Sequence, residues 1–217
     1  LGANTLDKFK EEMPSRFLME GISEANVVGM ATGMALEGKI PYVNTIATFI
    51  TRRSYEQVVL DASLHNVNVR LIGNGGGLVY APLGPTHLAT DDIAILRAIP
   101  NMTIVAPADA EEMKRLIPQT VDWPGPIYIR LAKGGDKVVS RDELPFEIGR
   151  AIELKSGGDV TLVTTGVTLQ IALDAATRLS EEGIGAGVLH MHTVKPLDEE
   201  ALMERLSNVP ALVTVEE

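Results

Sequence analysis

The 217-residue chain contains no cysteine, which excludes disulfide scaffolds, thiol nucleophiles and cysteine-based zinc or iron–sulfur sites. Lys and Arg number 19 against 29 Asp and Glu, so the net charge of −10 argues against binding to nucleic acid or to an acidic membrane surface. The longest nearly apolar run, residues 27–36, spans about ten residues and is too short to cross a bilayer. Charged residues over positions 7–12 stand where a secretory signal would be apolar, so a cytoplasmic location is expected.

The first 131 residues alternate short apolar runs with longer amphipathic stretches, a pattern typical of an α/β domain with a parallel sheet. Helices are expected over residues 23–36, 52–65 and 109–121, and Asp109 is expected to cap the third of these. The expected strands are Arg16–Met19, Pro41–Ile46, Val69–Gly73, Thr103–Ala106 and Ile127–Leu131.

A second, smaller α/β unit is expected over residues 151–217, after a charged and turn-rich linker over 132–150. Its last strand would lie at a sheet edge with no helix after it, so this unit is expected to be partial or to be covered by another chain. Its expected strands are 160–165, 185–190 and 211–215, and its expected helices are 168–182 and 198–206.

Two segments place polar side chains at the carboxyl edge of the first sheet, where α/β proteins bind ligands. Glu24 follows Gly21-Ile22-Ser23 at the start of a helix, where an acid either complements the helix dipole or serves a site. The small and apolar residues after Glu24 favour a partly buried carboxylate. His87 ends the rigid turn Gly84-Pro85-Thr86-His87, so its imidazole is presented from a loop.

Other candidate residues carry a weaker signal. Arg52 and Arg53 lie between Phe49 and Tyr55, although ordinary helix packing by Tyr55 beside solvated arginines would give the same pattern. His190 and His192 share one face of a strand, but a structural role is expected because no third metal ligand lies near them. No metal site is therefore predicted on this chain.

Ordered motifs over essentially the whole chain resemble the pyrimidine-binding and carboxy-terminal domains of transketolase and its thiamine diphosphate relatives. Relatives with this fold carry out several different ketol or acyl transfers. The matching segments are Gly21-Ile22-Ser23-Glu24, Gly33–Gly38, Thr48-Phe49 with Tyr55-Glu56-Gln57, Gly84-Pro85-Thr86-His87, Arg97–Met102, Ala106–Asp109 and Met191–Asp198.

The resemblance implies a role for four of these residues. Glu24 would hydrogen-bond the ring nitrogen of the cofactor's aminopyrimidine and favour the tautomer that removes a proton from the thiazolium carbon. Phe49 would stack on the pyrimidine, and Tyr55 would line the same pocket. His87 would contact the oxygens of the donor substrate.

The resemblance also implies three candidate cations and two departures. Arg53 near the pyrimidine, and Arg130 or Lys133 after the last strand, would hold an anionic end of a ligand or substrate. Fused transketolases carry an aspartate at the position of Leu83 and a histidine near that of Gly75, and both contact the donor hydroxyls. Because a site without these polar groups loses affinity for the hydroxyls they serve, an unusual donor is expected.

The family's magnesium and diphosphate motif is missing from this sequence, since neither Gly134-Gly135-Asp136 nor Gly157-Gly158-Asp159 matches it. The resemblance therefore implies an amino-terminal subunit that binds the diphosphate and Mg²⁺, in an α2β2 heterotetramer. The chain is identified as the carboxy-terminal subunit of a split transketolase, which would transfer a two-carbon ketol unit from a ketose or ketose phosphate to an aldose.

Three alternatives stay open. The Gly-Pro-Thr-His turn argues against the beta subunit of a 2-oxoacid dehydrogenase. The six-residue step from Phe49 to Tyr55 argues against a 1-deoxyxylulose-phosphate synthase. A non-catalytic scaffold of the same fold would have no need of Glu24, Phe49 and His87 together.

Overall fold

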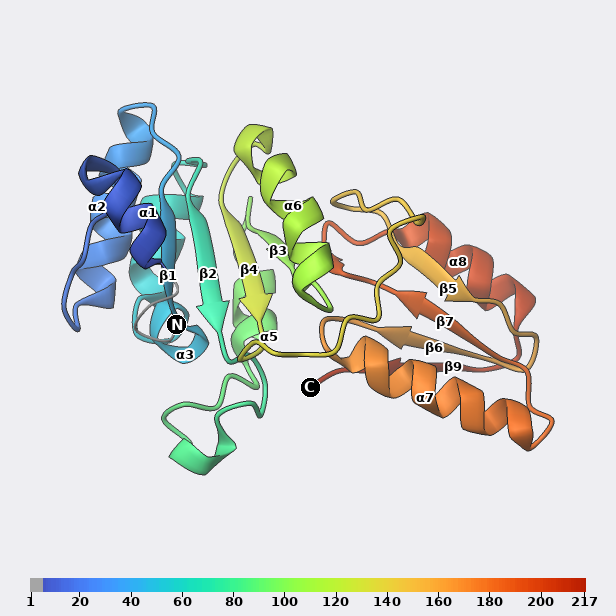
Figure 1. The fold of residues 1–217 in the computed structure, drawn as a ribbon. Coiled ribbons are helices and arrows are strands. Elements are labelled where there is room, and N and C mark those ends of the chain that lie inside the picture. The colour runs from blue at the N-terminus through green and yellow to red at the C-terminus, as the bar shows by residue number, and fades with distance from the viewer. Residues whose placement is uncertain (1–5) are drawn as a thin grey trace.

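A computed structural model describes residues 6–217, which form two α/β units lying side by side (Figure 1). One sheet has the strand order β1-β2-β4-β3-β8 and the other has the order β5-β7-β6-β9. The strands are β1 Tyr42–Ile46, β2 Arg70–Asn74, β3 Thr103–Val105, β4 Ile127–Leu131, β5 Ile152–Lys155, β6 Val160–Thr164, β7 Ala186–His190, β8 Thr193–Lys195 and β9 Leu212–Val215.

Helices cover both sheets, and within the described residues none of them is long and apolar enough to cross a membrane. The α-helices are α1 Asp7–Glu12, α2 Glu24–Leu36, α3 Ala47–Ile50, α4 Tyr55–Gln57, α5 Asp92–Arg97, α6 Ala110–Asp122, α7 Thr168–Glu181 and α8 Glu199–Asn208. Shorter turns are the 3-10 segments η1 Pro14–Arg16 and η3 Ala81–Leu83, and η2 Val58–Ser63 is π-helical.

The predicted α/β class with parallel sheets is confirmed, since β1, β2, β4 and β3 run parallel, as do β7, β6 and β9. The predicted cap on α6 is also confirmed, because the Asp109 carboxylate accepts from the amides of Glu111 and Glu112. The two antiparallel strands, β5 and β8, were not expected, because each has only three or four residues.

Two local predictions are wrong. Residues 16–19 form no strand: Pro14 begins η1, and the Leu18 and Met19 side chains that suggested a buried strand are exposed. The single helix expected over 52–65 is instead α4 followed by the π-helical η2.

The two units share a hydrophobic core. Strand β8 of the second unit pairs antiparallel with β3, at the edge of the first sheet. One buried cluster then runs from Ile129 on β4 through Leu116 on α6 to Leu162 on β6. Phe146 and Ile148, from the expected linker, are buried in the same cluster. The connection between the units is therefore packed rather than loose.

A buried polar network joins α6 to β7 within this interface. The Glu112 carboxylate lies 3.1 Å from His190 Nε2 and accepts from the Ala108 amide at 2.7 Å. Burial raises the pKa of the Glu112 carboxyl, but the hydrogen bond to His190 and the His190 charge outweigh it, so the pKa lies below its ordinary value. His192 stacks on Phe146 at 4.0 Å, and burial together with His190 lowers its pKa to about 3. Both histidines therefore have the structural surroundings that the sequence suggested.

We predict that acid destabilises the protein partly through His192. In the unfolded chain this imidazole takes up a proton near pH ~6.5, whereas in the folded chain it stays neutral down to about 3. The unfolded state therefore binds more protons in this window, and the free energy of unfolding falls as pH drops through it, by up to roughly 1.4 kcal/mol per pH unit. Urea unfolding of wild type and His192→Gln between pH 7.5 and 4.5 should give a flatter pH dependence for the variant. Parallel curves would contradict this contribution.

Candidate active site

The carboxyl ends of β1 and β2 bring three segments together. Helix α3 begins at Ala47, directly after β1, and the glycines over 75–77 follow β2. Helix α2 precedes β1, so its first residue, Glu24, also lies at this edge of the sheet. The sheet therefore gathers an acid, the Phe49 ring and a glycine-rich loop from distant parts of the sequence.

Glu24, Arg53 and Phe49 form a compact group. The Glu24 side chain is 10% exposed, and its Oε2 accepts from Arg53 Nη1 at 2.7 Å. The Arg53 guanidinium carbon lies 4.1 Å from the centroid of the Phe49 ring, as in a cation–π contact. The Glu24 carboxylate and the Phe49 ring thus both contact the planar guanidinium of Arg53.

His87 joins this group from residues 84–88, here called the His87 loop. Its ring meets the Phe49 ring edge-on, with the centroids 5.2 Å apart. Its Nδ1 lies 2.9 Å from the hydroxyl of Thr86, which orients the half-buried imidazole. Glu24, Phe49 and His87, singled out from the sequence, therefore lie in one chain of contacts.

Side chains from the turn after β1 hold the His87 loop by its carbonyl oxygens. Thr48 Oγ1 donates to the Thr86 carbonyl at 3.1 Å. Arg52 Nη2 donates to the carbonyls of Pro85 at 3.3 Å and Leu88 at 2.9 Å. No role for Arg52 is predicted from the sequence, because these contacts join residues 33 and 36 positions apart.

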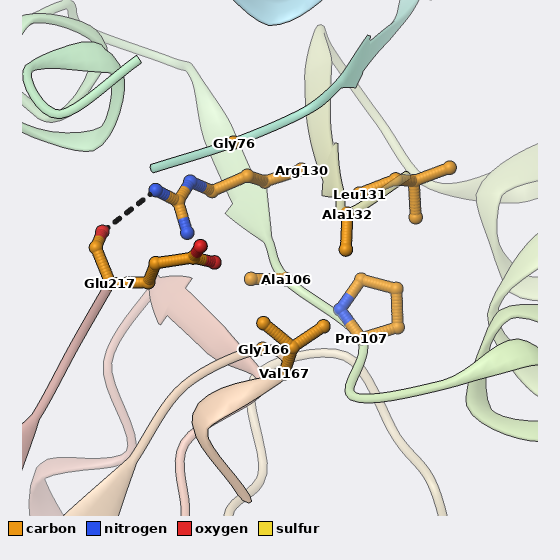
Figure 2. Close-up of a pocket in the computed structure, with 9 residues that line it drawn as sticks. All are labelled: Gly76, Ala106, Pro107, Arg130, Leu131, Ala132, Gly166, Val167 and Glu217. Atoms are coloured by element: carbon orange, nitrogen blue, oxygen red, sulfur yellow. Dashed lines mark hydrogen bonds between the residues drawn. The ribbon is translucent and has the colours of Figure 1, made fainter. Parts of the chain in front are cut away.

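Arg130 lies below this loop, in the interior. Its side chain is 5% exposed and its Nε donates to Asp92 Oδ2 at 2.9 Å, while Tyr128 donates to the same oxygen at 2.7 Å. Its Nη2 reaches the Ala89 carbonyl at 3.3 Å, at the foot of the His87 loop. Figure 2 shows Arg130 at a narrow crevice between the two units, with a hydrogen bond to the Glu217 carbonyl at 2.9 Å.

The remaining predicted cations and Tyr55 have different surroundings. Arg130, expected to hold a substrate anion, is occupied by acceptors of this chain, whereas Lys133 is exposed in the loop after β4. The hydroxyl of Tyr55 donates to the Ile95 carbonyl at 3.1 Å, and its ring packs partly against the core. The structure therefore ties Tyr55 to α5 and does not bring Arg130 into the Glu24 group.

The glycine-rich loop explains one departure from the family pattern. Gly75 has φ +72°, and a Cβ atom built there would overlap the ring of Tyr80. The Tyr80 ring thus fills the space that any side chain at this position would need. Leu83, the other departure, is 57% exposed at the end of η3.

Two family models match the chain and together account for nearly all of it. The model described as "Transketolase, pyrimidine binding domain" matches residues 2–135, and "Transketolase, C-terminal domain" matches residues 149–217. The chain belongs to the transketolase family. Membership of this family implies the use of thiamine diphosphate.

Curated relatives of the chain include subunits of transketolases. It is 38% identical over 216 residues to the 6-deoxy-6-sulfo-D-fructose transketolase subunit SqwH of Clostridium sp. (strain MSTE9), covering 100% of this chain and 67% of that protein. It is 39% identical over 217 residues to one subunit of the apulose-4-phosphate transketolase of Phocaeicola vulgatus, covering 100% of this chain and 70% of that protein. The chain therefore spans about two thirds of the length of these relatives.

Among solved structures, the chain resembles one described as a split gene transketolase in an inactive beta4 tetramer. The TM-score is 0.91 at 36% identity, covering 100% of this chain and 71% of that one. This similarity supports a transketolase-type subunit.

We predict that Arg52 keeps the His87 loop in place. Replacing Arg52 by Met removes the donors to Pro85 and Leu88 and leaves Thr48 as the remaining contact from that turn. The amides of His87 and Gly84 form hydrogen bonds within this turn region. Their hydrogen exchange should become roughly five- to tenfold faster, because the variant loses about 1–1.4 kcal/mol of the free energy that holds the loop closed. Arg178→Met, an equal charge change on α7, is the control, and equal exchange in both variants would refute the role of Arg52.

We predict that Gly75 tolerates no side chain while Tyr80 is present. Gly75→Ala should cost about 1–3 kcal/mol, because it combines an unfavourable positive φ with overlap of the Tyr80 ring. Gly38→Ala is a matched control, since Gly38 has φ +79° and no atom near its added Cβ. Urea unfolding should show a larger loss in the free energy of unfolding for Gly75→Ala than for Gly38→Ala. Adding Tyr80→Ala to Gly75→Ala should remove only the difference between these two losses. Equal losses at the two glycines would contradict the overlap.

Proposed function

We propose that the chain is the carboxy-terminal subunit of a thiamine diphosphate-dependent transketolase, which transfers a two-carbon ketol unit from a ketose or ketose phosphate to an aldose. The observation that carries this proposal is the contact chain from Glu24 through Arg53 and Phe49 to His87. These residues come from three segments that only the folded chain brings together. A scaffold subunit would have no use for this arrangement.

The residues fit the pyrimidine half of the cofactor. A nearly buried carboxylate and an aromatic ring already share a planar nitrogen-bearing group, the Arg53 guanidinium. In our proposal Glu24 holds a proton at the ring nitrogen of the aminopyrimidine, and Phe49 stacks on its plane. Tyr55 lines the pocket from the side of α5.

His87 acts at the other end of the proposed site. Bound thiamine diphosphate supplies the nucleophilic carbon that takes up and releases the ketol unit. We infer that His87 hydrogen-bonds the donor's hydroxyl or carbonyl oxygens, because the Thr86 hydroxyl occupies Nδ1 and the loop fixes the ring. The carbonyl contacts of Thr48 and Arg52 hold the His87 loop against the turn that carries Phe49.

We propose that a second subunit, with the pyrophosphate-binding domain and most of the Mg²⁺ ligands, completes the site in an α2β2 heterotetramer. Helix α2 is apolar on most sides, and its outer face leaves Met30 and Leu36 exposed. Ile22, just before α2, is 90% exposed, and Leu60 on the adjoining η2 segment and Leu64 directly after it are exposed as well. Burying this surface would also close over Glu24, at the start of the same helix.

We propose an unusual donor substrate. The part of it that lies near η3 carries fewer hydroxyl groups than common sugar phosphates do, or carries different groups. Leu83 and the Tyr80 ring occupy positions where polar donors would otherwise reach substrate hydroxyls. Lys133, exposed after β4, remains our candidate for an anionic end of the substrate. Arg130 would instead support the foot of the His87 loop through Ala89.

We further propose that residues 1–131 and 151–217 are two domains joined by residues 132–150. The first five residues of this division lie outside the described part of the chain. The buried Phe146 and Ile148 favour a fixed orientation of the two domains.

The proposed role of Glu24 predicts that Glu24→Gln abolishes transfer in the assembled complex. Gln keeps the size of the side chain but cannot hold the ring nitrogen's proton, so the rate should fall by on the order of 10²–10⁴-fold. Ketose consumption by complexes of wild type and variant would measure this, with calorimetry of thiamine diphosphate and Mg²⁺ on the same samples.

The control for this experiment is Glu37→Gln, an exposed acid at the other end of α2. It should assemble and turn over like wild type. Full activity of an assembled Glu24→Gln complex would refute the catalytic role, and absence of cofactor binding in every complex would favour a scaffold subunit.

A further inference from the structure

Arg53 makes two contacts that stand at the centre of the proposed pyrimidine site. Its Nη1 donates to Glu24 Oε2 at 2.7 Å, and its guanidinium carbon lies 4.1 Å from the Phe49 ring centroid. An arginine that held an anionic ligand would keep its donors free for that ligand. Here Nη1 is directed to an acid of the same chain.

The guanidinium and the aminopyrimidine present the same chemical features. Each is planar and rich in nitrogen, and each can donate an N–H to a carboxylate while its face meets an aromatic ring. One carboxylate and one ring face therefore serve either group, but not both at once.

From this overlap we propose that Arg53 occupies the aminopyrimidine position until the cofactor binds, and that cofactor binding displaces it. The inference rests on the proposed function, since it takes Glu24 and Phe49 as the pyrimidine site. Arg53 is thereby a self-blocking residue, which raises the cofactor concentration needed to fill the site.

Exposure shows which partner moves. The Glu24 side chain is 10% exposed and belongs to α2, whereas the Arg53 side chain is 44% exposed on the turn between α3 and α4. Arg53 can therefore swing into solvent without disturbing a helix. While it is in place, it compensates the charge of a nearly buried carboxylate.

The experiment is a calorimetric titration of thiamine diphosphate with Mg²⁺ into the complex with the amino-terminal subunit, for wild type and Arg53→Met. Removing an ion pair and a cation–π contact that compete with the cofactor should tighten binding about 3- to 30-fold. Arg178→Met, an equal charge loss on α7, should bind like wild type. Weaker binding by Arg53→Met would overturn the proposal and make Arg53 a cofactor ligand, and unchanged binding would overturn it too.

A second measurement tests the overlap without the cofactor. In Arg53→Ala, millimolar methylguanidinium should bind between Glu24 and Phe49 and raise the melting temperature. It should do so neither in wild type, where Arg53 fills the site, nor in Arg53→Ala combined with Glu24→Gln.

The two measurements separate the two proposals. No shift with methylguanidinium, or the same shift in all variants, would overturn the self-blocking role. Equal cofactor binding by wild type and Arg53→Met would overturn the self-blocking role and leave the proposed function standing, whereas absence of cofactor binding in every complex would overturn both.

Discussion

The antiparallel pairing of β8 with β3 is the interaction on which the rest of the structure depends. It places a strand of the second unit at the edge of the first sheet and continues beyond the strands, where the Ala106 amide donates to the His192 carbonyl at 2.7 Å. The shared core around Leu116 and Leu162 follows from this attachment. Because β4 lies beside β3, a second unit held in this way also fixes the crevice into which Arg130 points (Figure 2).

The polar groups inside this interface limit which orientations the two units can adopt. Glu112 and His190 satisfy one another only when α6 lies against β7. Apolar side chains alone would tolerate small rotations of one unit against the other, whereas a buried hydrogen-bonded pair loses its partner at once. The apolar cluster therefore supplies the buried area of the interface, and the polar network fixes the position of one unit relative to the other.

The parts of the fold that local sequence patterns determine were predictable. Strands β2 and β4 are rich in apolar residues and almost wholly buried, as is typical of parallel strands that are covered on both faces. Strands β5 and β8 depend on long-range pairing, and their few residues carry no periodic signal. For residues 16–19 the local pattern predicts a strand that does not form. The apolar run suggests a strand, but Leu18 and Met19 lie exposed on the surface.

The candidate site likewise has a part that the sequence predicts and a part that depends on long-range packing. Glu24, Phe49 and His87 stand in recognisable motifs at strand or helix ends, so their convergence at one sheet edge could be expected from topology. The pairing of Glu24 with Arg53 spans 29 positions and depends on how α2 packs against the turn after α3, which no local pattern encodes. The contact of Arg130 with Asp92 could not be predicted, because a cation at the end of a strand looks available, whereas Asp92 lies against it in the interior.

The overlap between Gly75 and the Tyr80 ring has a consequence for the history of this family. A side chain at the Gly75 position and a tyrosine at position 80 overlap, so gaining either one in the presence of the other is expected to cost stability. A protein with a small residue at both positions avoids this cost. Aligned relatives should therefore show the two positions changing together.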